Sequence, residues 1–245
     1  MGKIIAIGGG EIGKYETLAF DREIVALTGK KHPKALFIPT ASGEAPGYIE
    51  TFNRVYGKRL GCKTDALLLL KRRPDVKELK EKVLGSDLVY VGGGNTLMMM
   101  RRWRAVGLDK VLLEAYSKGV VLSGLSAGGI CWFEYGHSDS VKFYHPDNWD
   151  YIKVKGLGLI KGINCPHFSD EERRRDFSMF MKKHAGVGIA IDSRAALEVV
   201  DGNYRVLTAR NGDGIYRIYR AGKRIVVKSI PKEKELRPLI ELYKH

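Results

Sequence analysis

The segment best suited to chemistry is Gly124-Leu125-Ser126-Ala127-Gly128, which has the G-x-S-x-G pattern of a nucleophile elbow. The strand-like residues Val120–Leu122 lead into it, and the run Ile130–Tyr135, which we expect to be helical, leads out. In this context Ser126 occupies a sharp strand-to-helix turn with an exposed hydroxyl, and the Ala127 N–H can stabilise an oxyanion. The pattern also occurs by chance in structural turns, but the flanking strand and helix favour a catalytic serine.

A serine nucleophile needs a base, which is normally histidine. The chain has six histidines: His32, His137, His145, His167, His184 and His245. We expect His32 and His245 to be exposed and His184 to cap a helix, which leaves three. His167 follows the apolar stretch Leu157–Ile163 and precedes a charged helix. This is the position of a residue held at the carboxyl end of a strand. His137 lies only 11 residues after Ser126, and it fits a pocket wall or a loop contact equally well.

The first glycine-rich turn, Gly8–Gly13, formally satisfies the G-x-G-x-x-G pattern of dinucleotide sites. Such sites also need a carboxylate near the end of the second strand to hold the ribose. Here the second strand ends in Pro39-Thr40-Ala41-Ser42, and Glu44 lies beyond that tip. The pattern therefore favours a tight structural turn over a dinucleotide site.

The second glycine-rich turn, Gly92-Gly93-Gly94, follows the strand-like residues Leu88–Val91. Glycines at a strand's carboxyl end leave backbone N–H groups free for an oxyanion or a phosphate, and Asn95 or Thr96 can cap the next helix. No Lys-Ser/Thr pair follows, so the turn is not a nucleotide P-loop.

The order of elements predicts an α/β fold in one domain, residues 1–245. Apolar runs alternate with amphipathic stretches, as in a parallel sheet with helices on both faces. We expect strands at Lys3–Ile7, Lys34–Pro39, Ala66–Leu70, Leu88–Val91 and Val120–Leu122, and helices near Thr17–Leu27, Ile49–Arg59, Val76–Val83, Thr96–Arg102 and Asp109–Ser117. After Gly186 the pattern is strand-like, and Asp201-Gly202 and Ala221-Gly222 predict hairpin turns. The expected architecture is a three-layer, mostly parallel sheet flanked by helices, with antiparallel C-terminal hairpin strands and a short helix near Leu236–Tyr243.

Composition restricts the partners. The chain has 245 residues, and 42 Lys+Arg against 28 Asp+Glu give a net charge of +14, which suits nucleic acid, an anionic membrane or an acidic small substrate. The absence of zinc-finger spacing or an RNA-recognition signature disfavours nucleic acid. Apolar runs fall short of the ~18–20 residues that span a bilayer, and the N-terminus lacks a signal-peptide pattern. Because the cysteines Cys62, Cys131 and Cys165 are scattered, we expect a cytoplasmic protein without a metal site.

Three motifs together resemble the peptidase E family, the serine aspartyl dipeptidases related to cyanophycinase. They are Gly92-Gly93-Gly94-Asn95-Thr96, the elbow at Ser126 and Pro166-His167-Phe168, in the family's order and at similar spacing. The resemblance covers the chain up to about residue 200 and implies a class I glutamine-amidotransferase-like fold with serine in place of cysteine. It also implies cleavage of short peptides that begin with aspartate, without a cofactor. By this resemblance Ser126 is the nucleophile, His167 is the base, and the Gly93 and Ala127 N–H groups form the oxyanion hole.

The resemblance leaves two candidates for the acid of the triad. The family places an acid downstream of the nucleophile, and Asp139 is closest in position. Glu134 competes with it from the expected elbow helix, about 12 Å along the axis from Ser126. We place Asp139 first.

Substrate recognition is expected from the helix that follows His167, which opens with three adjacent arginines. The family's arginine for the substrate aspartate is best matched by Arg173, and a planar guanidinium can hold a carboxylate through two hydrogen bonds. Asn95 is the second expected substrate-binding residue. Surface ion pairs, such as Glu171 with Arg174, are the alternative explanation of the arginines.

Two other functions remain open at the level of sequence. A cyanophycinase-like or isoaspartyl peptidase acting on β-aspartyl linkages would use the same architecture. A non-catalytic RNA-binding protein would use the +14 surface instead. The expected partner is a small acidic peptide rather than a membrane, and the oligomeric state, a homodimer included, stays open.

Overall fold

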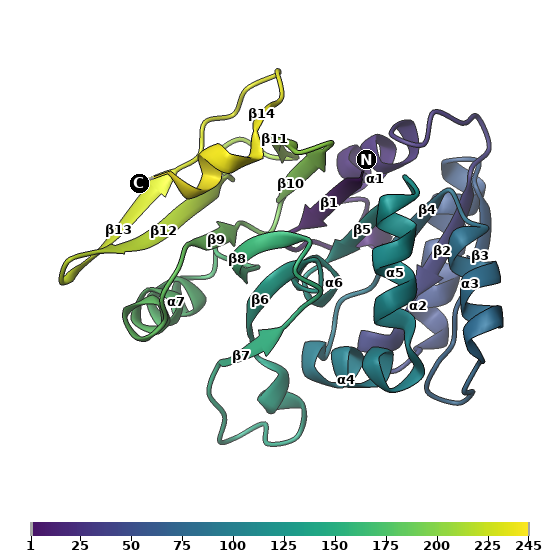
Figure 1. The fold of residues 1–245 in the computed structure, drawn as a ribbon, viewed down its shortest axis with the longest axis horizontal. Coiled ribbons are helices and arrows are strands. Elements are labelled where there is room, and N and C mark those ends of the chain that lie inside the picture. The colour runs from purple at the N-terminus through teal and green to yellow at the C-terminus, as the bar shows by residue number, and fades with distance from the viewer. Residues whose placement is uncertain (1, 245) are drawn as a thin grey trace.

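Within residues 2–244, which the computed structural model describes, the larger sheet has eight strands in the order β14-β11-β10-β1-β5-β4-β2-β3 (Figure 1). The bounds are β1 Lys3–Ile7, β2 Lys34–Ile38, β3 Lys63–Ala66, β4 Leu88–Val91, β5 Val121–Leu125, β10 Ala195–Val200, β11 Asn203–Thr208 and β14 Arg237–Pro238. Strands β1 to β5 run parallel, whereas β10, β11 and β14 are antiparallel additions. The predicted mostly parallel sheet is confirmed. His245, expected to be exposed, lies outside the described residues.

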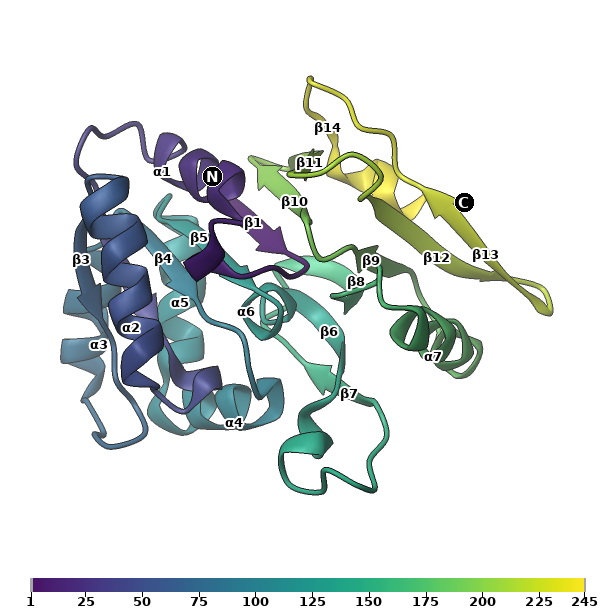
Figure 2. The ribbon, with the colours of Figure 1, turned by 180° about the vertical axis from the view of Figure 1, so that it is seen from behind.

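Helices cover both faces of this sheet (Figures 1 and 2). Ile4 and Leu36 point to one face and pack with helices α3, α4 and α5, while Ile5 and Phe37 point to the other and pack with α1, α2 and η3. The bounds are α1 Leu18–Ala26, α2 Pro46–Phe52, π-helical η3 Asn53–Arg59, α3 Val76–Leu84, α4 Thr96–Val106 and α5 Leu108–Ser117. Because neighbouring strand residues face opposite sides, a continuous apolar strand buries both faces and produces the predicted three layers.

A second sheet of six strands stands beside the first in the described part of the chain, in the order β13-β12-β9-β8-β6-β7. Its strands are β6 Phe133–Ser138, β7 Ile152–Lys155, β8 Ile160–Cys165, β9 Gly188–Ile191, β12 Ile215–Ala221 and β13 Arg224–Ser229. Helix α7, Glu171–Lys183, packs on one face through Phe177 and Met181. The sequence predicted the C-terminal hairpins, but β10 and β11 extend the larger sheet, whereas β12 and β13 belong to the second.

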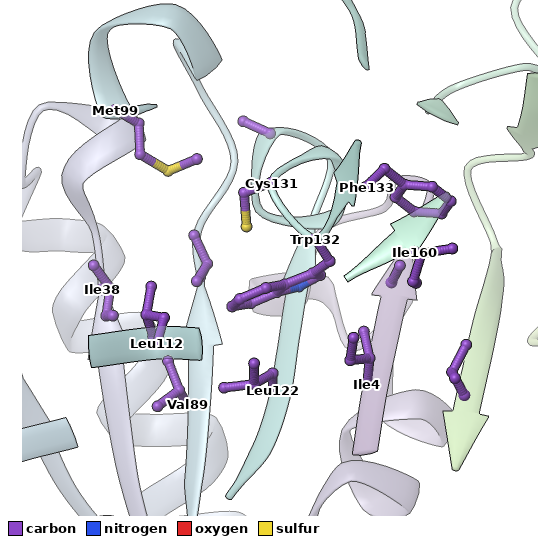
Figure 3. Packing of buried hydrophobic residues seen from close by; sticks show 14 of the residues in the cluster. Ile4, Ile38, Val89, Met99, Leu112, Leu122, Cys131, Trp132, Phe133 and Ile160 are labelled. Carbon is purple, nitrogen blue, oxygen red and sulfur yellow. The ribbon is translucent and has the colours of Figure 1, made fainter. Parts of the chain in front are cut away.

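One hydrophobic cluster includes residues of both sheets, and the carboxyl ends of β1 and β8 meet. Figure 3 shows Trp132 among Ile4 and Leu122 of the larger sheet and Ile160 of the second, all fully buried. At the strand ends, the His167 N–H, just after β8, donates to the carbonyl oxygen of Gly8, just after β1, at 3.1 Å. The ends of β1, β5 and β8 are thereby held together.

Two predicted elements are wrong. The strand expected at Ala66–Leu70 ends at Ala66, because the N–H groups of Leu69 and Leu70 donate to the Glu44 carboxylate instead of a neighbouring strand. The helix expected at Ile130–Tyr135 is also absent: α6 spans only Ala127–Ile130, and strand β6 begins at Phe133. Aromatic residues favour strands, and β6 pairs with β7 and β8.

The remaining short elements are turns of 3₁₀ helix: η1 Ile12–Lys14, η2 Thr40–Ser42, η4 Ser140–Phe143 and η5 Leu239–Tyr243. The last of these lies within the predicted closing helix. None of the helices among residues 2–244 is long and apolar enough to cross a membrane.

Candidate active site

Ser126 lies at a strained turn between β5 and α6. Its φ of 54° and ψ of −108° are in a region that side chains rarely adopt, which costs about 1–3 kcal/mol. The turn holds because the Ser126 N–H donates to Ile7 O at 2.9 Å and because glycines flank it. A Cβ atom at Gly124 would lie 2.3 Å from Gly128 O, and one at Gly128 would lie 2.1 Å from Val91 O. The G-x-S-x-G spacing is therefore required by close backbone packing.

His167 forms a hydrogen bond with Ser126, with 2.8 Å between its Nε2 and the serine Oγ. The serine comes from the larger sheet and the histidine from the loop after β8 in the second sheet. The two residues that the sequence pairs as nucleophile and base thus lie together where the sheets meet.

The second nitrogen of His167 contacts a residue that the sequence did not indicate. Nδ1 lies 3.3 Å from the hydroxyl of Ser193, in the loop between β9 and β10. Strands β8 and β9 are parallel neighbours, so His167 and Ser193 follow strand ends at the same edge. A polar residue just after Gly188–Ile191 was a usable signal, because the carboxyl ends of parallel strands commonly carry functional residues.

Neither predicted triad acid contacts His167. The carboxylate of Asp139 is 2.8 Å from Nη2 of Arg173. Glu134 lies exposed on strand β6 and accepts the Gly162 N–H at 3.4 Å, so its expected position on an elbow helix is wrong. Within residues 2–244 no carboxylate hydrogen-bonds to the His167 ring.

His167 is neutral at physiological pH. Burial, and after it the nearby Arg173 charge, lower its pKa from 6.5 to about 4, against the opposing effects of Asp139 and Asp170. A neutral imidazole can accept a proton from Ser126, so this histidine is in the form required of a general base.

Gly93 and Ala127, whose N–H groups the family resemblance assigns to an oxyanion hole, both lie beside Ser126: a Cβ atom at Gly93 would be 3.5 Å from the Ser126 Cβ, and Ala127 is the next residue in the chain. The Ala127 N–H opens helix α6, where N–H groups have no partner within the helix. The Gly93 N–H lies 3.5 Å from the Tyr48 hydroxyl, a long contact that a stronger acceptor can displace. Gly93, Tyr48 and Leu125 line a cavity of about 430 Å³ together with Gly10, Glu11, Ile12, Gly13, Gly47 and Thr51.

The two predicted substrate-binding residues both have partners inside the protein. Asn95 is buried, and its side-chain oxygen accepts the Met98 N–H at 3.0 Å as the N-cap of α4. Arg173 is 4% exposed, donates to Pro166 O and pairs with Asp139. The structure therefore gives Asn95 the capping role and places Arg173, already paired, next to the His167 loop.

The other two histidines considered as a base, His137 and His145, do not contact Ser126. His137 is buried, with Nε2 2.6 Å from Asp176 and its ring stacked on Tyr151. His145 is exposed in the loop after η4. No group of three or more His, Cys, Asp or Glu side chains in the described part of the chain could hold a metal ion.

The first glycine turn packs directly against the His167 ring. A Cβ atom at Gly9 would lie 2.4 Å from His167 Nδ1 and 3.0 Å from the Ser193 hydroxyl. This close approach agrees with the interpretation of Gly8–Gly13 as a structural turn.

Gly9→Ala is therefore expected to displace the imidazole and to lower kcat by about 100-fold, since a shift of ~1 Å in a catalytic group costs that much. Steady-state kinetics on a short peptide measures the loss. Gly57→Ala is the matched control, because a Cβ atom there makes only ordinary van der Waals contacts, with Thr64 and Cys62 O, and none with His167 or Ser126. Wild-type kcat in Gly9→Ala would show that the ring position does not matter.

Comparisons with known proteins identify the family of the chain. The sequence matches peptidase family S51 over residues 4–207. It is 35% identical over 235 residues to the uncharacterized peptidase YgaJ of Bacillus subtilis strain 168, covering 94% of this chain and 98% of that protein. The uncharacterized peptidase Lmo0363 of Listeria monocytogenes EGD-e is 32% identical over 157 residues, 61% of this chain and 73% of that one.

A solved peptidase structure from an acI-B1 Actinobacterium has the same fold, with a TM-score of 0.68, 19% identity and 97% of each chain covered. These matches confirm the resemblance to peptidase E that the three sequence motifs indicated. A match across most of the chain and a relative aligned over nearly its full length lead to one conclusion: the chain belongs to peptidase family S51.

Proposed function

We propose that this peptidase is serine-type and cleaves short peptides through an acyl-enzyme on Ser126. The observation that carries the proposal is the 2.8 Å hydrogen bond between the strained Ser126 hydroxyl and the neutral His167 imidazole. His167 Nε2 takes the hydroxyl proton as Oγ attacks the scissile carbonyl carbon. The same proton then passes to the leaving amine as the C–N bond breaks, and water attacks the ester that remains.

The tetrahedral intermediates place a negative charge on the former carbonyl oxygen. The Ala127 and Gly93 N–H groups are the donors that we assign to this oxyanion. Donors of this kind are typically worth about 3–4 kcal/mol each in the transition state. The long Gly93–Tyr48 contact leaves the Gly93 donor weakly engaged before substrate binds.

The cavity beside Gly93 suits a small ligand. Its volume of about 430 Å³ falls within the range of ~300–1,000 Å³ that is common for small-molecule sites. The cavity supports a dipeptide or a similarly short peptide as substrate.

An N-terminal aspartate is the substrate preference that we propose, with Arg173 as its partner. Arg173 is buried beside the His167 loop, and its charge reaches His167. Its guanidinium is bound to Asp139, whose side chain is 38% exposed and can turn outward. A substrate carboxylate would therefore replace the Asp139 carboxylate on Arg173, and the two would compete.

Asp139→Asn tests this exchange. The substitution removes the competing charge, so KM for Asp-Leu is expected to fall about tenfold, as for a hydrogen bond to a charged group, while KM for Ala-Leu stays unchanged. Because Asp139 raises the pKa of His167, the assays belong at pH 8, where His167 is neutral in both proteins.

Glu134→Gln is the control, since it neutralises a carboxylate of the same strand–loop segment that does not contact Arg173. Equal changes of KM for Asp-Leu and Ala-Leu would contradict the role of Arg173. Including β-Asp-Leu in the panel separates an α-aspartyl dipeptidase from a β-aspartyl peptidase.

A further inference from the structure

We propose that the Ser193 hydroxyl positions His167 in the place that a carboxylate takes in a Ser-His-Asp triad. This inference rests on the proposed function, because it concerns the residue that orients the base of that reaction. It gives the site an uncharged third member.

The hydrogen bonds of His167 define the role. For Nε2 to accept the Ser126 proton it must carry no hydrogen, so the proton of the neutral ring is on Nδ1. That N–H faces the Ser193 hydroxyl, 3.3 Å away, which accepts it. By accepting this N–H, the Ser193 hydroxyl stabilises the tautomer that the reaction requires and holds the ring in place.

The position of Ser193 is itself fixed. The Ser193 N–H donates to the Ser169 hydroxyl at 3.3 Å. The loop then closes in a turn, in which the Ala195 N–H donates to Asp192 O at 3.0 Å. Ala195 O in turn accepts the Gly8 N–H at 3.0 Å, beside the glycine turn under His167. These bonds hold the backbone on either side of Ser193, from which its hydroxyl reaches Nδ1.

Within residues 2–244, none of the carboxylates around His167 hydrogen-bonds to its ring. Asp139 pairs with Arg173, and Asp170 caps α7 by accepting the Glu172 and Arg173 N–H groups. Asp192, next to Ser193, accepts the Gly214 N–H at 2.8 Å. Among residues 2–244, Ser193 is the one side chain that hydrogen-bonds to Nδ1.

An uncharged partner has a measurable consequence. A carboxylate stabilises the imidazolium and raises the pKa of a histidine, whereas a hydroxyl can accept the Nδ1–H without adding charge. Burial and the Arg173 charge then keep the pKa of His167 at about 4, because Asp139 and Asp170 offset them only in part. The base should remain neutral, and the enzyme active, well below pH 6.

The test compares the wild type with Ser193→Ala, Ser193→Thr and Ser193→Asp by two readouts. The first is the pH profile of kcat/KM on a short peptide. The second is the imidazole ¹⁵N spectrum, in which the His167 signals are identified by their loss in His167→Gln. Ser178→Ala, which removes an exposed hydroxyl on α7, is the control.

We expect Ser193→Ala to populate both tautomers of His167 and to lower kcat about tenfold. Ser193→Thr, which keeps a hydroxyl, should show the single tautomer and the kcat of the wild type. Ser193→Asp should move the acid limb of the profile upward by about 1–3 pH units. If Ser193→Ala does not fold, Ser193→Thr and Ser193→Asp still decide the question.

An unchanged tautomer in Ser193→Ala together with an unchanged acid limb in Ser193→Asp would overturn the proposal. The spectrum separates this failure from failure of the proposed function. If no peptide is cleaved by any variant, the function is wrong, but the tautomer of His167 still reports on Ser193.

Discussion

Ser126→Ala is expected to lower kcat for peptide hydrolysis by about 10⁵–10⁶-fold, the size of loss seen when a serine nucleophile is removed. The acyl-enzyme cannot form without Oγ, and the oxyanion donors alone supply only residual catalysis. The fold should persist, because the turn is held by the Ser126 N–H and by the glycine packing rather than by the hydroxyl. Progress curves at high enzyme concentration, with a thermal melt of both proteins, measure the two quantities.

Ser123→Ala is the matched control for Ser126→Ala. It removes a buried hydroxyl three residues earlier on β5, where Oγ donates to Val89 O at 2.9 Å and does not contact the site. We expect a loss of stability of about 1 kcal/mol and an unchanged kcat. A kcat of Ser126→Ala close to that of Ser123→Ala would contradict the assignment of the nucleophile.

His167→Gln is expected to lower kcat by about 10⁴–10⁶-fold. Glutamine can hydrogen-bond to Ser126 but cannot take its proton at neutral pH, so the variant separates positioning from base catalysis. The double variant with Ser126→Ala should be no slower than Ser126→Ala alone, because residues that act as a unit are not additive.

His32→Gln, an exposed loop histidine bound to Gly61 O, is the control for His167→Gln. Additive losses in the double variant would show that His167 acts independently of Ser126. Steady-state kinetics on the same dipeptide, with each protein checked for folding by circular dichroism, provide the comparison.

The sequence predicted the parts of the site that depend on local patterns. The elbow at Ser126 is visible because Gly124 and Gly128 must be glycine for the backbones to pass. The parallel strands β1, β2, β4 and β5 are visible because both faces are buried and the runs are mostly apolar. His167 is visible because an apolar strand leads to it and a charged helix follows.

The parts that the sequence missed depend on contacts between distant segments. Nothing near Asp139 shows that Arg173, 34 residues later, takes its carboxylate. Glu44 ends β3 because its carboxylate accepts N–H groups from residues 25 and 26 positions later. The apolar pattern of Leu67–Leu70 gives no sign of these bonds. Strand pairing likewise decides that β12 and β13 join a second sheet, and the same pairing brings Ser193 to His167.

The net charge of +14 has a more limited role than the composition suggested. The one buried arginine among the described residues is Arg173, and Asp139 already balances it. Recognition of an acidic substrate would therefore depend on the exchange of one carboxylate for another at a single guanidinium.

The most direct test of Ser126 as an activated nucleophile is intact-mass analysis after reaction with a fluorophosphonate, followed by peptide mapping. We expect one adduct per wild-type chain, on Ser126, no adduct in Ser126→Ala, and labelling slowed by orders of magnitude in His167→Gln. The same result would distinguish a serine peptidase from a non-catalytic RNA-binding protein. An unlabelled wild-type protein, or an adduct that persists in Ser126→Ala, would contradict the proposed mechanism.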